Sequence, residues 1–558
     1  MALNSEVIGR ITENIPLAET AWTLIPILLT VLCVYLTRRI LVSMVVGIVS
    51  ANFIAANFHL FDTFMLTERT FMGVLFQPDA AGAFLGVFNR WHASIIIFLI
   101  GLGFITSMVI LSGGARAFVV AASKRVKTRK GVQYLSVLTG ILLMIDDYFN
   151  AMVNGTIAKT LGDRHRLSRA RTSYIVDSIA APICIAAPVS SWAVAIMGNI
   201  SGVYQQLGLY YERNIFVDFL MMVPYHFYVF AAIGMVLVTI KWDFNIFGMT
   251  ALQEKFHETG EDDAADLVAE GLLSGTQSTK GTVWDFWTPI IVLFIFTVGG
   301  MLITGIQGAI RNNAFGGEYL WLFTVFDNWS LSISITLGGI ASAIAAILVG
   351  ARHVRNGSVT KEQFKKALIA GPRCMFGAIC ILVLSWTIGR SVGYLGLGAF
   401  VANTLNAAGI GAGLIPFIMF ISAALLAFAI GTSWGTFALV LPIAGTVIAA
   451  TDNMHMLLPA MSAVLSGAVW GDHSSPISDT TVLAAAGTTC KTIDHWRTQM
   501  PYALIAAALA AVGYLVFGLT GIVWLGYIAF LIAIAVVAVF ARSRQKKITP
   551  YVPTEDKA

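Results

Sequence analysis

The chain has 558 residues, of which 57% are hydrophobic and only 12% are charged, and its mean hydropathy is +0.79. A soluble globular chain has roughly a quarter of its residues charged, so this composition excludes a soluble enzyme or binding module and indicates a polytopic membrane protein. The net charge of +5 comes from basic loops and not from a nucleic-acid-binding patch. The five cysteines form no CxxC pair or Cys/His cluster, and no cofactor is predicted.

Apolar runs of bilayer-spanning length predict about 11 full transmembrane helices. They lie at residues 22–37, 40–58, 92–112, 173–199, 215–240, 287–309, 329–350, 368–389, 459–488, 500–518 and 520–541. Two segments with polar centres, 131–162 and 413–450, do not fit as simple spans. The predicted fold is all-α, and these two segments need a different explanation.

Basic loops orient the chain, because Lys and Arg concentrate on the cytoplasmic side of a membrane. Four clusters are predicted to be cytoplasmic, at 116–130, 164–171, 352–366 and in the C-terminal tail at 542–547. Four loops are poor in Lys and Arg and are predicted to face outward, at 59–91, 200–214, 310–328 and 451–458.

The first two basic clusters flank segment 131–162, so both of its ends are predicted to lie on the cytoplasmic side. Its arms of about 16 residues reach roughly 24 Å, which predicts a re-entrant helical hairpin with its tip near "DDYFN" (Asp146 to Asn150). Segment 413–450 is the mirror case. Its centre reads "GTSWGT" (Gly431 to Thr436), and it is predicted to enter from the outer face.

Each hairpin is preceded by a span and followed by a span that prolines interrupt. Pro182 and Pro188 fall in 173–199, and Pro476 falls in 459–488 within "GDHSSPISDTT". The two sets run in opposite directions, which is typical of secondary transporters with inverted repeats and a midplane binding site. The predicted organisation is an N-terminal region with an outer loop (1–91), a first repeat (92–241), a cytoplasmic linker (242–285), connecting helices (286–350), a second repeat (351–518) and a last helix with a cytoplasmic tail (519–558). A solvated linker is expected, with a short surface helix as the alternative.

Polar groups at the hairpin tips and helix breaks are the candidate site, because an ionised side chain in the bilayer centre costs a few kcal/mol or more. The predicted ion- and substrate-binding residues are Asp146, Asp147, Asn150, Ser190, Ser191, Thr432, Ser433, Trp434, Asp472, Ser474, Ser475, Ser478, Asp479 and Thr480. Oxygen ligands suit a hard cation, so Asp147, Asp472 and Asp479 are predicted to bind sodium.

Several alternatives stay open at this point. Asp472 or Asp479 could cap a half-helix instead of binding an ion, and either Asp146 or Asp147 could face the cavity. His473 could share a proton with a carboxylate or could be a structural group. Asp177 is expected to pair with Arg171 or Arg169 in the neighbouring basic loop.

These motifs resemble the NhaC-type Na+/H+ antiporter family. The resemblance rests on "GDHSSPISDTT" (471–481), on "GTSWGT", and on the block from "DDYFN" through "GDRHRLSRARTSYIVDSIAAPICIAAPVSSW" (162–192). It implies inverted repeats with paired re-entrant hairpins, a bacterial inner membrane, and exchange of Na+ for H+. The family also holds members that move organic solutes.

The resulting hypothesis is a secondary active transporter that exchanges cytoplasmic Na+ for external H+ at a shared carboxylate site. The alternative is a Na+- or H+-coupled carrier of an amino acid or small organic acid. The protein is not expected to be an enzyme, since the GxGD signature of intramembrane proteases fails at Val469, two residues before Gly471. Its expected partners are small ions, a small organic solute in the alternative, and the lipid bilayer; a homodimer is left open.

Overall fold

The computed structural model describes residues 15–543 except 38, 79–83, 124–125, 210–212, 260–277, 313–324, 326–327, 409–410, 452 and 477. Over these residues the chain is helical apart from one antiparallel pair of short strands, β1 (Phe76–Pro78) and β2 (Phe84–Phe88). Within the same part of the chain, 9 helices are long and apolar enough to cross a membrane, or up to 11 when two bent helix pairs are counted. The predicted all-α polytopic fold is confirmed.

The chain divides into two compact units. Unit 1 comprises residues 1–120, 194–219 and 275–400, and unit 2 comprises 121–193, 220–274 and 401–558. The division falls within four helices, namely α6 (Gly114–Ser123), α10 (Ser191–Gln206), α11 (Ile215–Met222) and α19 (Leu397–Ala407).

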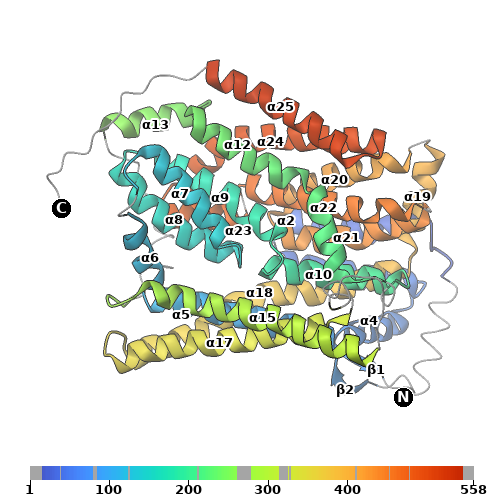
Figure 1. Ribbon diagram of the computed structural model, residues 1–558. Coiled ribbons are helices and arrows are strands. Elements are labelled where there is room, and N and C mark those ends of the chain that lie inside the picture. The colour runs from blue at the N-terminus through green and yellow to red at the C-terminus, as the bar shows by residue number, and fades with distance from the viewer. Residues whose placement is uncertain are drawn as a thin grey trace. The chain divides into compact units, whose positions relative to one another are not determined.

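Unit 1 is built around long apolar helices. Its remaining elements are η1 (Ala21–Leu24), α2 (Ile25–Thr37), α3 (Ile40–Ala55), α4 (Leu60–Leu75), β1, β2, α5 (Arg90–Leu111), α15 (Val283–Arg311), α17 (Leu331–Arg355) and α18 (Lys361–Gly393). In Figure 1, α5 packs beside α17, and α15 packs against α17. A Cβ at Gly101 of α5 would lie 2.4 Å from the carbonyl oxygen of Gly339 on α17. Small residues therefore allow these helix backbones to touch, as is common in membranes.

Unit 2 contains both hairpins, both helix breaks and all of the second interrupted helix, whereas most of α10 belongs to unit 1. Its remaining elements are α7 (Arg129–Leu142), α8 (Asp147–Arg164), α9 (Arg169–Ala186), η2 (Val223–Tyr225), α12 (Phe227–Trp242), α13 (Gly248–Thr259), η3 (Ala412–Leu414), α20 (Ile415–Ile430), α21 (Ser433–Ala450), η4 (Met454–Met456), α22 (Leu457–Ser474), α23 (Asp479–Thr488), α24 (Thr492–Thr520) and α25 (Val523–Ser543). Helices α7, α8 and α9 lie side by side, and α20 packs along α22 (Figure 1).

Both predicted hairpins form. Helices α7 and α8 turn back on each other across residues 143–146, and the side chain of Asn154 donates to the carbonyl oxygen of Ser136 on the other arm at 3.0 Å. Helices α20 and α21 meet at Gly431, whose φ of +77° is the left-handed conformation that glycine adopts without strain. Glycine at this position ends α20 and lets Thr432 start α21.

Both predicted breaks form as well. Helices α9 and α10 are bent by 46° across the stretch that contains Pro188. Helix α22 ends at Ser474 and α23 begins at Asp479, with Pro476 between them. Pro182, by contrast, is accommodated inside α9. The breaks follow from proline, which removes a backbone donor and restricts the residue before it.

Three predictions need correction. Segment 215–240 is not one continuous span, because α11 and α12 are bent by 49° around η2, which contains Pro224. The N-terminal helices α2 and α3 have 13 and 16 residues, or about 20 and 24 Å, and are shorter than a full span of about 30 Å. The stretch 59–91 is not merely a loop, since it holds α4 and the strand pair.

The start of the predicted linker is packed onto unit 2. Helix α13 falls within 242–285, and its Gln253 is buried. The Gln253 side chain accepts from the backbone N–H of Ser168 and donates to the carbonyl oxygen of Arg166, both at 3.0 Å. The short-helix alternative therefore holds for this part, while residues 260–277 lie outside the described residues.

Candidate functional site

The first hairpin tip is joined to the first break by a carboxylate and a serine. Asp146 caps α8, and its Oδ1 accepts from the backbone N–H of Phe149 at 2.9 Å. Its Oδ2 accepts from the hydroxyl of Ser191, the first residue of α10, also at 2.9 Å. The backbone N–H of Ser191 donates to the carbonyl oxygen of Ile145 at 2.7 Å. Asp146 is thus held in place by two half-helices.

The second hairpin tip is joined to the second break in the same way. Asp472 lies near the end of α22, and its Oδ2 accepts from the backbone N–H of Ser433 at 2.9 Å and from the Ser433 hydroxyl at 2.5 Å. Its Oδ1 accepts from the hydroxyl of Ser478 and, at 3.4 Å, from that of Thr480. All four of these residues are buried. Asp472 therefore lies in a cage of hydroxyl groups that has no exposed side.

The two halves use the same pairing with the partners exchanged. In the first half the carboxylate, Asp146, is on the hairpin and the serine, Ser191, is on the interrupted helix. In the second half the serine, Ser433, is on the hairpin and the carboxylate, Asp472, is on the interrupted helix.

Four helix N-termini converge in this part of unit 2. Each is capped by a side chain, and the caps are Asp146 for α8, Ser190 for α10, Thr432 for α21 and Ser478 for α23. The hydroxyl of Tyr148 on α8 donates to Oδ2 of Asp479, the first residue of α23. The rings of Trp192 on α10 and Trp434 on α21 are 5.9 Å apart and meet edge to face. Together these contacts join all four N-termini into one cluster.

Asp147 differs from the other carboxylates of this cluster. It is the first residue of α8 and is buried, yet its Oδ2 has no hydrogen-bond partner among the described residues. It interacts electrostatically with Asp146, Asp479 and Asp472. Asp479 is exposed, unlike the other three carboxylates. Asp147 therefore offers free acceptor capacity, and Asp479 is the exposed carboxylate of the cluster.

Within the described part of the chain, no ion pair with Arg or Lys neutralises this cluster. Among the ion pairs of the described residues, none joins an Arg or Lys to Asp146, Asp147, Asp472 or Asp479. The described residues also contain no group of three or more His, Cys, Asp or Glu side chains placed to hold one metal ion. Asp147, Asp472 and Asp479 thus share a region without forming a preassembled three-carboxylate ligand set, and hydroxyl oxygens surround Asp472 instead.

Other predicted site residues have local structural contacts. Asn150 donates to the carbonyl oxygen of Gly140 at 2.7 Å and so holds the two arms of the first hairpin together. Ser474 donates within α22, and Ser475 donates to the carbonyl oxygen of Phe428 on α20 at 2.8 Å. Ser190 and Thr432 act as helix caps. These side chains shape the site, and their hydrogen bonds already have partners within the protein.

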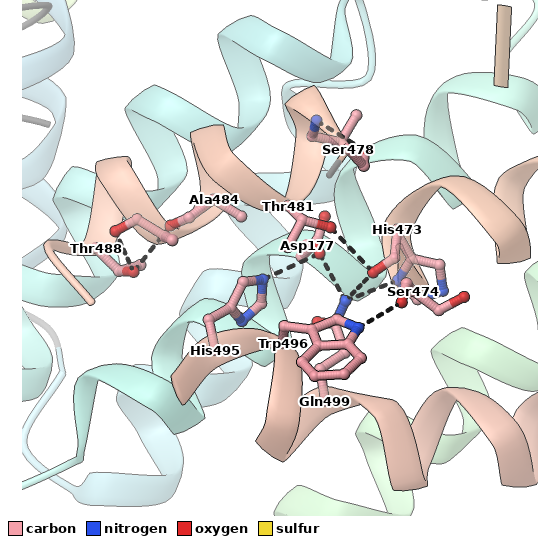
Figure 2. A network of polar contacts seen from close by, with 12 residues as sticks. Asp177, His473, Ser474, Ser478, Thr481, Ala484, Thr488, His495, Trp496 and Gln499 are labelled. Carbon is pink, nitrogen blue, oxygen red and sulfur yellow. Dashed lines mark hydrogen bonds and ion pairs between the residues drawn. The ribbon is translucent and has the colours of Figure 1, made fainter. Parts of the chain in front are cut away.

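A second polar network lies beside the second break (Figure 2). Oδ2 of Asp177 on α9 is 3.1 Å from Nε2 of His495 and accepts from the amide of Gln499 at 2.7 Å, both on α24. Gln499 also donates to the carbonyl oxygen of His473, whose Nε2 contacts the hydroxyl of Tyr228. The His473 imidazole therefore has contacts at both ring nitrogens, with Tyr228 at Nε2 and with Gln499 at Nδ1.

The expected pairing of Asp177 with Arg171 or Arg169 is wrong, and Arg169 instead pairs with Asp163 at 3.7 Å. The Arg171 guanidinium is fully buried and donates to the side chain of Gln133 at 3.0 Å and to the carbonyl oxygen of Thr239 at 2.7 Å. Its nearest carboxylate is Asp243, at 3.6 Å. Arg171 therefore joins α9 to α7 and α12, and Asp177 takes its partners from α24.

Sequence reasoning missed two residues of the cluster. Tyr148 stands inside the quoted "DDYFN" stretch, and a hydroxyl next to two intramembrane aspartates was an available signal. Trp192 follows the Ser190–Ser191 pair directly and is fully buried. Its contact with Trp434 spans two distant segments, so no local pattern could have predicted it.

Comparison with known proteins finds an antiporter family and relatives that are named as antiporters. The sequence profile of the Na+/H+ antiporter family matches residues 183–519. An uncharacterized protein of Haemophilus influenzae is 33% identical over 532 residues, covering 95% of this chain and 97% of the relative.

Two further relatives match in part. The arginine/ornithine antiporter ArcD of Halobacterium salinarum is 38% identical over 145 residues, covering 22% of this chain and 30% of ArcD. The malate-2H+/Na+-lactate antiporter of Bacillus subtilis is 30% identical over 214 residues, covering 35% of this chain and 40% of the relative.

The crystal structure of the YdaH transporter of Alcanivorax borkumensis has a similar fold, with a TM-score of 0.51, 12% identity, and coverage of 85% of this chain and 90% of YdaH.

Proposed function

The chain belongs to the Na+/H+ antiporter family, and from this membership we propose that it exchanges cytoplasmic Na+ for external H+. It is a multi-pass membrane protein and a secondary transporter, and its family and relatives are transporters rather than enzymes. We place it in the bacterial inner membrane with a cytoplasmic C-terminus, as the basic tail and the positive-inside rule indicate.

The environment of Asp472 carries the proposal. A buried carboxylate without a basic partner is costly inside a membrane, and this one is surrounded by three hydroxyl groups. A serine or threonine hydroxyl that donates its proton to a carboxylate keeps lone pairs on its oxygen. The cage therefore presents several oxygen atoms and one negative charge, which is the ligand set that a hard monovalent cation requires.

In this proposal Na+ and H+ compete for the same carboxylate. Either ion cancels the charge of Asp472, and only a neutral site can move through the low-dielectric interior at an acceptable cost. Asp479 is exposed and bound by Tyr148, so it is the carboxylate that an arriving ion meets first. Asp147, with its unpartnered oxygen, assists by attracting the ion into the cluster.

We further propose that the hairpins and interrupted helices belong to two inverted repeats, at 92–241 and 351–518. The exchanged Asp146–Ser191 and Ser433–Asp472 pairs support this, because each half closes its hairpin tip onto its own break. In each proposed repeat the leading helix, α5 or α18, belongs to unit 1, while the hairpin belongs to unit 2. Unit 2, which contains the site, would then change conformation at its two hairpin tips.

Proteoliposomes containing a pH-sensitive dye test the exchange directly. Adding Na+ outside wild-type vesicles should move protons, and Asp472→Asn should abolish this movement because the amide carries no charge for an ion to cancel. Asp163→Asn is the matched control, since Asp163 lies on α8 beside Arg169 and outside the cluster. Normal Na+-driven proton movement in Asp472→Asn would rule out the shared site.

A second candidate is a cation-coupled carrier of a small organic acid or amino acid. Two relatives are named as antiporters of arginine and ornithine and of malate and lactate. The four converging helix N-termini also suit this role, because backbone N–H groups there bind carboxylate groups in other transporters. Uptake of labelled malate, lactate, arginine and ornithine into the same vesicles distinguishes the candidates. The carrier is favoured if one of these solutes is taken up and if Na+/H+ exchange is absent when no solute is added.

A further inference from the structure

The Asp177 network consists of buried titratable groups that the proposed exchange mechanism does not use. Asp177, His495, Gln499 and His473 are all almost completely buried in unit 2. Figure 2 shows the side chains of His495 and Gln499 reaching from α24 toward Asp177 on α9. The Asp177–His495 contact of 3.1 Å is short enough for one proton to be shared between the carboxylate and the imidazole.

This network has unused hydrogen-bonding capacity. Oδ1 of Asp177, Nδ1 of His495 and Oε1 of Gln499 are buried and have no hydrogen-bond partner among the described residues. Buried polar atoms are nearly always paired in proteins, and three unpaired atoms within one small network are unusual. Oδ1 of Asp177 and Nδ1 of His495 are unused acceptor atoms, and adding a proton to either one would convert it into a donor.

The charge of the pair also changes with its proton. With one proton, Asp177 and His495 are neutral together, either as two neutral groups or as an ion pair. Without it, one negative charge stays buried and no Arg or Lys of the described residues pairs with it. The described titratable groups that interact electrostatically with this pair are Tyr228 on α12, His473 on α22 and Asp479 on α23.

We propose that Asp177 and His495 form a proton-binding site separate from the Asp472 cage, and that this pair carries the proton that is exchanged for Na+. The inference rests on the proposed exchange of Na+ for H+ and departs from it in one respect: Na+ binds at Asp472, whereas the proton binds at the Asp177–His495 pair and not at the same carboxylate. With Na+ on Asp472 or with a proton on the Asp177–His495 pair, the two sites together carry the same net charge, so one ion can replace the other without changing the total charge of unit 2.

Gln499 provides the physical connection between the two sites. Its amide nitrogen has two N–H groups, and it donates to Oδ2 of Asp177 and to the carbonyl oxygen of His473. His473 directly follows Asp472 at the end of α22. When Asp177 is ionised it holds the Gln499 amide strongly, and when it is protonated it releases it. The end of α22 beside Asp472 therefore responds to the proton on Asp177.

The test separates proton transport from sodium transport. Full-length wild-type, Asp177→Asn, His495→Gln and control Asp163→Asn proteins are reconstituted, and two fluxes are measured. Na+-driven proton movement should fall at least about tenfold in Asp177→Asn, because a group that carries a proton cannot be replaced by one that does not titrate. Exchange of labelled Na+ for unlabelled Na+, which needs no proton, should stay within about twofold of wild type. Asp472→Asn should lose both fluxes.

Infrared spectra of the carboxyl region give a readout that does not depend on transport. A protonated-carboxyl band should be present in wild type, absent in Asp177→Asn and shifted in His495→Gln. If the band is absent from wild type, or if Asp177→Asn retains proton movement, the proton-site proposal is overturned. If Asp177→Asn does not fold, His495→Gln must still shift both the band and the pH profile of proton movement; an unchanged profile overturns the proposal. Absence of Na+-driven proton movement from wild type, with the band present, would refute the exchange function and leave the proton site standing.

Discussion

The most informative single substitution is Ser433→Ala. Ser433 donates its backbone N–H and its hydroxyl to the same oxygen of Asp472, at 2.9 and 2.5 Å. Alanine removes only the hydroxyl, keeps the backbone donor, and leaves the carboxylate charge in place. The substitution therefore tests whether this oxygen atom is a ligand of Na+, without altering the charge of the site.

The expected effect follows from the strength of the contact. A hydrogen bond to a charged group contributes about 1.5–3 kcal/mol, and each 1.4 kcal/mol corresponds to a factor of about ten in affinity. If the Ser433 oxygen binds Na+ with comparable strength, the Na+ concentration for half-maximal exchange should rise roughly ten- to a hundredfold. The measurement is Na+-driven proton movement in proteoliposomes over a range of Na+ concentrations, with the maximal rate fitted separately.

Ser466→Ala provides the matched control. Ser466 is buried on α22, the helix that carries Asp472, and its hydroxyl has no hydrogen-bond partner among the described residues. Its loss should leave the half-maximal Na+ concentration unchanged. If Ser433→Ala also stays within about twofold of wild type, the hydroxyl cage does not bind Na+ and the reasoning from its geometry is refuted.

Three further predictions concern the scaffold of the site. Tyr148→Phe removes the donor to Asp479 and should lower the maximal exchange rate about tenfold at unchanged thermal stability; a rate equal to wild type would show that this contact has no part in ion entry. Asn154→Ala leaves buried groups of the first hairpin unpaired and should lower the free energy of unfolding in detergent by about 1–3 kcal/mol, and an unaltered unfolding midpoint would contradict this. Arg171→Met leaves the buried Gln133 side chain and Thr239 carbonyl oxygen without their donor, while the half-buried Asp243 keeps Arg129, and should cost about 1–3 kcal/mol for each acceptor left unpaired, seen as loss of folded protein on size-exclusion chromatography; normal yield would show that the guanidinium is dispensable.

Local sequence signals were sufficient for the parts of the fold that the backbone itself controls. Pro188 and Pro476 predict breaks because proline removes a donor, and Gly431 predicts a turn because it adopts positive φ without strain. Pro224 also indicates a bend, but it lies inside an apolar run long enough to be interpreted as one span. Helix α4 was missed because its stretch was interpreted from its low content of Lys and Arg alone.

Contacts between distant segments were beyond local reasoning. Asp177 was assigned to a basic residue six positions away, whereas its partner His495 is 318 residues away on α24. Asn150 is predicted to bind an ion or substrate, and tertiary packing adds a role that no local pattern indicates, because its side chain holds the two arms of the first hairpin together. Composition places carboxylates in the membrane, but only tertiary packing determines which of them meets a hydroxyl, an imidazole or no partner at all.

The charge balance of the cluster explains why a cation has to be part of any transport cycle. Four helix N-termini converge there, and at about half an elementary charge each they supply roughly two positive charges. Asp146, Asp147, Asp472 and Asp479 supply up to four negative charges, and no Arg or Lys of the described residues pairs with them. The remainder must be cancelled by mobile ions. If both ions bound within the cluster, exchange of Na+ for H+ would keep that remainder constant. An anionic solute would increase it, so even the carrier alternative requires a cation bound at the same time.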